Sequence, residues 1–182
     1  MVSQLAQSVI FVALPAILPG HGESAFRTLL GMRRFGMVHE STGSAKLIPA
    51  DAAWELDAIA KEASAQFVIT SLFAPDLGRD ELARHFRTMG MPMIAEHLAE
   101  AWSTCMHTTT TRAEEISKWM KDHATAQDTY VVIDTDVHRT ELLKSDVAQN
   151  TVIINGFLPG YKDLGRRVID MLRAQSPGRV HA

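Results

Sequence analysis

The chain has 182 residues, of which 46% are hydrophobic, 21% are charged and 7% are aromatic, and its formal net charge is −3. This length and composition fit one compact globular domain spanning residues 1–182, and they argue against a disordered chain. The small acidic excess argues against nucleic acid as a partner, because contacts of Lys and Arg with phosphates supply most non-specific affinity for nucleic acids.

The apolar run at residues 9–18 is the first predicted element. A secretion signal needs a cationic leader before its apolar segment, but the first Lys or Arg is Arg27. The ten residues of the run are also about half of what a membrane-spanning helix needs. Residues 9–13 are continuously apolar, which is typical of a strand buried on both faces. The only cysteine is Cys105, so no intramolecular disulfide can form. We therefore expect a cytoplasmic protein without membrane contact.

Further strands and helices alternate along the rest of the chain. Apolar runs predict strands at residues 67–71, 130–134 and 151–154. Helical spacing of apolar side chains predicts helices at 51–64, 79–89, 93–102 and about 161–174. The clearest helix start is a capping box, in which Thr111 is the N-cap and Glu114 is the third helical residue.

This alternation predicts an α/β domain with a mainly parallel central sheet and helices on both faces. Ligands of such sheets bind at the carboxyl ends of the strands. The least regular segment, residues 31–49, is expected to be a loop or a small excursion over that edge.

Two acids follow one of the predicted strands. Asp134 and Asp136 are two residues apart, so in an extended chain both side chains can point the same way. Carboxylates delivered by a buried strand are typical of a hard-cation site. An acidic turn that caps the next segment explains the same pattern, and both interpretations stay open.

Two hydroxyls and one cation are the other candidates. Thr70 and Ser71 close a predicted strand, where their hydroxyls can bind an oxyanion or satisfy nearby backbone groups. Arg112 stands in the first turn of its helix, where a cation is unfavourable unless an anion or a carboxylate lies nearby.

These pieces, taken in order, resemble the haloacid dehalogenase (HAD) superfamily, and more closely the branch found in Swiss-army-knife RNA repair proteins. The resemblance extends from residue 9 to about residue 172. It rests on the first strand, on VITS at 68–71, on TTTTRAEEISKWMKDH followed by YVVIDTD, and on GFL at 156–158. It implies a HAD-like (Rossmannoid) three-layer sandwich, a phosphoryl-binding site and a magnesium site.

The resemblance also implies roles for individual residues. Thr70 or Ser71 matches the hydroxyl that holds the phosphoryl group, and Arg112 matches the basic residue. Asp134 and Asp136 match the late acids of the magnesium site. In the superfamily the first strand ends in an aspartate nucleophile, followed two residues later by an aspartate that is the general acid and base.

Neither catalytic aspartate is present in this sequence. Ala13 and Pro15 stand at the two positions, and neither offers a nucleophile, a proton donor or a metal oxygen. Magnesium prefers several oxygen ligands, so we expect two remaining carboxylates to bind it weakly. Aspartyl-phosphate chemistry is not expected.

Our leading hypothesis is a catalytically degenerate HAD-like domain. It would be a binding or regulatory module for a protein partner or for a phosphorylated ligand held by Thr70, Ser71 and Arg112. The alternative is a metal-dependent phosphohydrolase in which Asp134 or Asp136 and a metal activate water directly. A structural subunit without a ligand is a third possibility.

Other chemistries lack their motifs. The chain has no G-x-S-x-G nucleophile elbow of a serine hydrolase. Its one His-Glu pair, at His39, is followed by Gly43 where a zinc motif needs a second His. The nine Met residues are interpreted as fillers of the core, and the arginines near the C-terminus as a solvated face.

Overall fold

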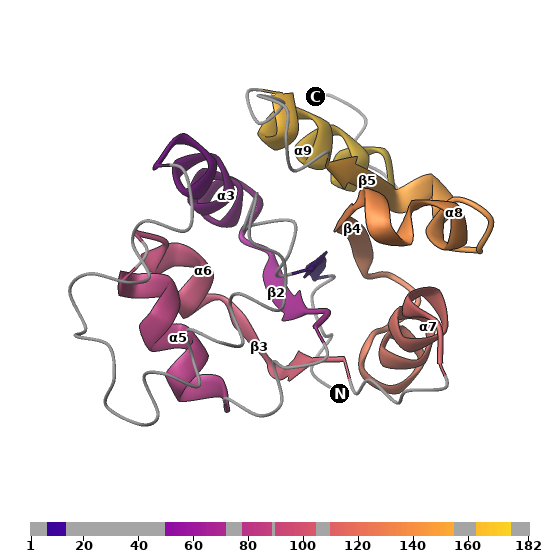
Figure 1. The fold of residues 1–182 in the computed structure, drawn as a ribbon, viewed down its shortest axis with the longest axis horizontal. Coiled ribbons are helices and arrows are strands. Elements are labelled where there is room, and N and C mark those ends of the chain that lie inside the picture. The colour runs from indigo at the N-terminus through magenta and orange to yellow at the C-terminus, as the bar shows by residue number, and fades with distance from the viewer. Residues whose placement is uncertain are drawn as a thin grey trace.

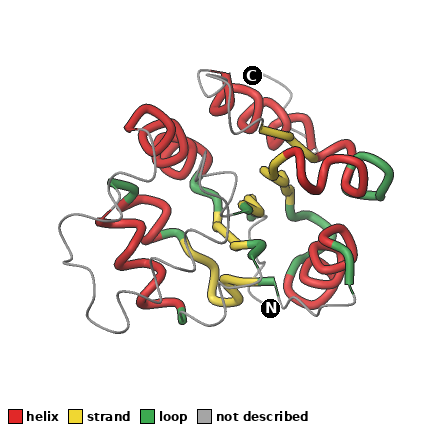
Figure 2. The backbone as a smooth tube through the Cα atoms, in the orientation of Figure 1, coloured by secondary structure: helices red, strands yellow, loops and turns green. Residues whose placement is uncertain are grey.

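The computed structural model describes residues 7–13, 50–71, 78–88, 90–104, 110–154 and 163–175. In these ranges five strands form one all-parallel sheet in the order β3-β2-β1-β4-β5. Figure 1 shows this sheet between two groups of helices, and Figure 2 shows the same layers by secondary structure. The predicted α/β fold class, with a parallel sheet covered on both faces, is confirmed.

The sheet is built around the first strand. β1 (Ser8–Val12) pairs with β2 (Gln66–Ile69) on one side and with β4 (Thr129–Thr135) on the other. β5 (Thr151–Ile154) extends the sheet beyond β4. Almost every residue of β1 and β2 is buried, as the continuous apolar runs predicted, because both faces of the sheet carry helices.

The strand at the other edge of the sheet, next to β2, was not predicted. Residues 93–102 were expected to form a helix, but α6 (Pro92–Glu96) ends early and β3 (Leu98–Ser103) pairs in parallel with β2. The prediction of a helix over the second half of this segment was wrong. Tertiary pairing outweighs the helical preference of Leu, Ala and Glu here.

In the described part of the chain, four helices cover one face of the sheet. They are α3 (Ala50–Ala63), α5 (Arg79–Thr88), α6 and α9 (Leu164–Gln175), and they enclose a core with Ile10 and Val12 of β1. These helices lie together on one side of the strands in Figure 1. α3 and α9 are neighbours, and the groove between them is described below.

The other face is covered by α7 (Arg112–His123) and the short α8 (Arg139–Leu142). Phe11 of β1 meets Trp119 of α7 edge to face, with ring centroids 5.3 Å apart, a geometry that adds about 0.5–1.5 kcal/mol beyond the area buried. A 3-10 turn, η1 (Asp136–His138), connects β4 to α8. A second, η2 (Ala148–Asn150), precedes β5.

The predicted capping box of α7 is confirmed. The Thr111 side chain accepts a hydrogen bond from the Glu114 N–H, and the Glu114 carboxylate accepts one from the Thr111 N–H at 2.7 Å. The helix therefore begins at Arg112, and this residue is held at the edge of the sheet where the strands end.

Side chains cover the exposed edge of β3. Arg79 donates to the carbonyls of Leu98 at 2.8 Å and Ala99 at 3.3 Å, and the Trp119 indole donates to Ala101 at 2.7 Å. Such cover protects an edge strand from pairing with another chain. Over the residues that the model describes, none of the helices has the length and apolar character to cross a membrane.

Candidate functional site

The carboxyl ends of the central strands bring three residues into one row. Ala13 directly follows β1 and donates its N–H to Ile133 at 3.0 Å, while Thr70 directly follows β2 and donates to Val12 at 2.9 Å. Continuing the strand registers places Ala13 between Thr70 and Asp134. All three residues are completely buried.

Arg112 connects the two ends of this row. Its Nη1 donates to the Thr70 carbonyl, and its Nε lies 3.2 Å from Asp134 Oδ2. The second contact is an ion pair rather than an aligned hydrogen bond. Since Thr70 and Asp134 flank β1 on opposite sides, the guanidinium bridges the end of β1. The sequence candidates Thr70, Arg112 and Asp134 therefore meet in one site.

Asp134 is the buried anion of this site. Its Oδ1 accepts a hydrogen bond of 2.6 Å from the Thr135 N–H. Burial raises the pKa of Asp134, while the Arg112 guanidinium and the Thr135 N–H oppose that rise. The carboxyl group thus has a protein partner at each of its oxygens.

The network continues to two residues that the sequence analysis did not identify. Arg112 Nη2 lies 3.2 Å from His138 Nε2, and His138 Nδ1 lies 3.6 Å from Glu141 Oε2. Because Arg can only donate, a hydrogen bond at this contact would have His138 Nε2 as its acceptor. Glu141 Oε1 accepts from the Ala113 N–H at 2.9 Å, so a carboxylate also faces the positive end of α7.

Hydroxyls line the same edge of the sheet. The side-chain oxygens of Thr70, Thr104 and Thr135 are buried and make no hydrogen bond with any residue in the described ranges. Ser71 is also buried. Buried hydroxyls are normally satisfied by protein, water or a ligand.

Asp136 does not join the buried network. It lies in η1, its side chain is 45% exposed, and its Oδ1 is 3.3 Å from Arg139 Nη1. Within the described ranges, no group of three or more His, Cys, Asp or Glu residues is arranged to hold a metal ion. Magnesium needs near-octahedral oxygen ligands, and Asp134 already has protein partners. The described residues at this edge therefore do not by themselves fit a Mg²⁺ site.

The parallel strand order, and the hydroxyl, cation and acid at the strand ends, define a Rossmannoid domain of the HAD type. A family model described as the HAD domain in Swiss Army Knife RNA repair proteins matches residues 30–157, more than half of the chain. The chain belongs to this family. HAD domains generally use Mg²⁺.

The matched range includes Thr70, Arg112 and Asp134 but not β1. The assignment of Ala13 to the nucleophile position therefore depends on its place at the end of the central strand. Pro15 lies outside the described residues. No curated protein and no solved structure gave a significant match to the chain.

Proposed function

We propose that this HAD domain binds a phosphorylated ligand and does not hydrolyse it. The observation that carries the proposal is Ala13, which is buried at the end of β1 between Thr70 and Asp134. A methyl group there cannot attack phosphorus or ligate a metal. A working enzyme of this type needs a carboxylate at this place.

The hydroxyls around Ala13 support a phosphoryl ligand. Thr70 and Thr135 have side-chain oxygens without hydrogen-bond partners in the described ranges, and Ser71 lies beside Thr70. Hydroxyls and a nearby guanidinium are suitable donors to phosphate oxygens. We infer that Arg112 contributes as part of its pair with Asp134, and that Mg²⁺ is bound weakly at most.

Two measurements test the proposal. Inorganic phosphate should raise the melting temperature of the wild-type chain, and this rise should be smaller in Thr70→Val, which keeps the shape and removes the hydroxyl. Hydrolysis of para-nitrophenyl phosphate with Mg²⁺ should be no faster for the wild type than for Asp134→Ala. Magnesium-dependent turnover that Asp134→Ala abolishes would instead establish the phosphohydrolase in which Asp134 and a metal activate water.

If phosphate does not raise the melting temperature of the wild type, the proposal of a phosphorylated ligand is rejected.

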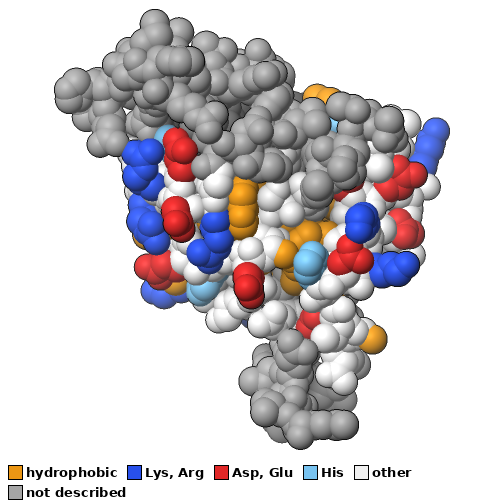
Figure 3. All heavy atoms as spheres, turned by 90° about the horizontal axis from the view of Figure 1, so that it is seen from below, with side chains coloured by type: hydrophobic (Ala, Val, Ile, Leu, Met, Phe, Trp, Pro, Cys, Tyr) orange, Lys and Arg blue, Asp and Glu red, His pale blue; other side chains and the backbone are white. Residues whose placement is uncertain are grey.

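The charge distribution does not suggest that the ligand is a nucleic acid. On the face seen in Figure 3, acidic and basic side chains are interspersed over the described part. This agrees with the net charge of −3.

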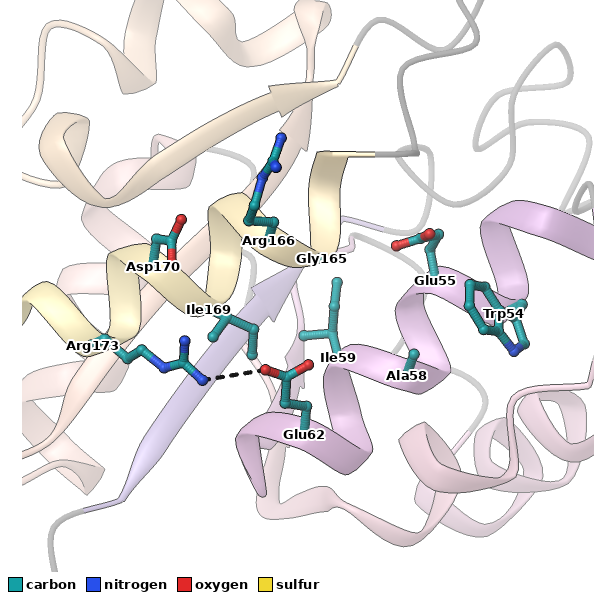
Figure 4. Close-up of a pocket in the computed structure, with 10 residues that line it drawn as sticks. All are labelled: Trp54, Glu55, Ala58, Ile59, Glu62, Gly165, Arg166, Ile169, Asp170 and Arg173. Carbon is teal, nitrogen blue, oxygen red and sulfur yellow. Dashed lines mark hydrogen bonds and ion pairs between the residues drawn. The ribbon is translucent and has the colours of Figure 1, made fainter.

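A second candidate function is protein binding, favoured by Trp54. This side chain of α3 is 67% exposed and lines a groove of about 280 Å³ between α3 and α9 (Figure 4). Large exposed aromatic side chains are frequent anchors of interfaces. Glu55 and Glu62 lie on the α3 side of the groove, and Arg166, Asp170 and Arg173 lie on the α9 side. Arg173 Nη2 is 3.3 Å from Glu62 Oε1, so these two charges pair within the chain.

This arrangement suits a second copy of the chain. Under two-fold symmetry the exposed Trp54 of each copy can pack on the groove of the other. Light scattering of the wild type and of Trp54→Ala tests it: the wild type should form a dimer that the variant does not. Equal melting temperatures would show that the variant is folded. A wild-type monomer at high concentration would reject this candidate.

A further inference from the structure

We propose that Arg112 is the permanent cation of this site and takes the role that a divalent metal has beside a strand-end carboxylate. Asp134 would then be unavailable to Mg²⁺ as long as Arg112 is present. This assignment goes beyond the proposed function, because it concerns the unliganded protein and needs no phosphorylated ligand.

The geometry of Asp134 is the first argument. One oxygen accepts the Thr135 N–H at 2.6 Å, and the other lies 3.2 Å from Arg112 Nε. The side chains of Arg112 and Asp134 are only 1% and 0% exposed, respectively. A metal ion would have to displace the guanidinium from a fully buried carboxylate.

The position of the guanidinium is the second argument. Arg112 is anchored by the Thr70 carbonyl on one side of β1 and by Asp134 on the other. Its Nη2 also lies 3.2 Å from His138 Nε2. A buried charge needs such partners to be tolerated. A dication bound beside it would face direct repulsion from a cation that cannot lose its proton.

The small residue in the row, Ala13, also fits a single cation. Ala13 adds no second carboxylate between Thr70 and Asp134, so within this row the positive charge of Arg112 meets one carboxylate. Two acids at this place would call for a cation of higher charge. An alanine in place of the acid at position 13 thus agrees with an arginine, which has one positive charge, in place of a divalent metal.

Thermal melting in MgCl₂, against KCl of equal ionic strength, tests the proposal on the wild type and four variants, one of which is Asp134→Asn. The wild type should show no saturable rise in melting temperature. Arg112→Met keeps the apolar stem and removes the charge, so Mg²⁺ should raise its melting temperature by roughly 5–10 °C at saturating concentration. The double variant Arg112→Met/Asp134→Asn should lose this response. Lys121→Met, the same change on the exposed face of α7, should behave as the wild type.

A saturable Mg²⁺ response of the wild type that Asp134→Asn removes would overturn the proposal. The proposal would also be overturned if Arg112→Met folds and Mg²⁺ does not raise its melting temperature. If Arg112→Met does not fold alone, its refolding yield from urea with and without MgCl₂ replaces the melting temperature, and a yield that Mg²⁺ does not raise also overturns the proposal. The titration contains no phosphate, so failure of the proposed ligand leaves its outcome unaffected.

Discussion

Arg112 and Asp134 form an ion pair that is buried at both ends, with Arg112 Nε 3.2 Å from Asp134 Oδ2. The pair joins the start of α7 to the end of β4, and the second contact of Arg112, to the Thr70 carbonyl, adds β2. One side chain thus holds a helix and two strands around the end of β1. Its removal should affect the stability of the whole edge.

Arg112→Met should therefore lower the free energy of unfolding by about 3–5 kcal/mol, the usual effect of leaving one partner of a buried pair alone. Urea unfolding followed by circular dichroism measures this value. The control Lys121→Met removes an exposed charge from the same helix and should change stability by less than about 0.5 kcal/mol. Equal effects of the two variants would show that the buried pair has no special importance.

Ala13→Asp tests how the row tolerates a second acid. The new carboxylate would be buried beside Asp134, and one guanidinium would have to balance two negative charges. Ala13→Asn is the matched control, because it has the same shape and no charge. At neutral pH and without divalent metal, Ala13→Asp should unfold at lower urea concentration than Ala13→Asn. Coincident unfolding curves would contradict the charge balance inferred for this site.

The strands that the sequence predicted are those with β-branched and aromatic residues. β3 was not predicted, because Leu98–Ser103 contains Leu, Ala and Glu at a spacing that also suits a helix. Its conformation depends on pairing with β2 and on side chains from other elements, Arg79 and Trp119, which bind its carbonyls. No window of the local sequence contains that information.

The candidate site was predicted in part for a similar reason. Thr70, Arg112 and Asp134 follow or precede recognisable elements, so the rule that parallel strands end at one edge brings them together. His138 and Glu141 lie in short turns without periodicity, and Glu141 binds the start of a helix 28 positions earlier in the chain. The burial of Arg112 by its partners is likewise a property of the assembled fold.

The capping box of α7 gives a separate prediction. Thr111→Ala should lower stability by about 1 kcal/mol, because the N–H of Glu114 loses its acceptor. Thr140→Ala is the control, since Thr140 is exposed in α8. Its effect should stay within about 0.5 kcal/mol. Thermal or urea unfolding of both variants measures the difference, and similar values for the two would contradict a stabilising cap.

The same box makes stability depend on pH. The hydrogen bonds with Thr111, the backbone N–H first, hold the pKa of Glu114 below its ordinary value of 4.5. A lowered pKa in the folded state means that the stabilisation is present above the unfolded pKa and is lost as pH falls through the folded one. Glu114→Gln should therefore be less stable than the wild type near neutral pH, and the gap should close in acid. A gap that is independent of pH would show that the charge is not involved.

The contact between α3 and α9 gives the last prediction, at Gly165. A methyl group at Gly165 would lie 3.0 Å from Glu55 Oε2 and 3.5 Å from an Ile59 carbon. The nearer atom is the end of a flexible side chain on the rim of a groove, so it can move aside (Figure 4). Gly165→Ala should thus gain helix propensity, about 0.5–1 kcal/mol, and melt roughly 1–4 °C higher.

Gly165→Leu provides the contrast, because its larger side chain would press on Ile59 and separate the two helices. It should melt below the wild type. If Gly165→Ala also melts lower, Glu55 cannot move aside, and the close approach of α3 and α9 requires glycine at this position.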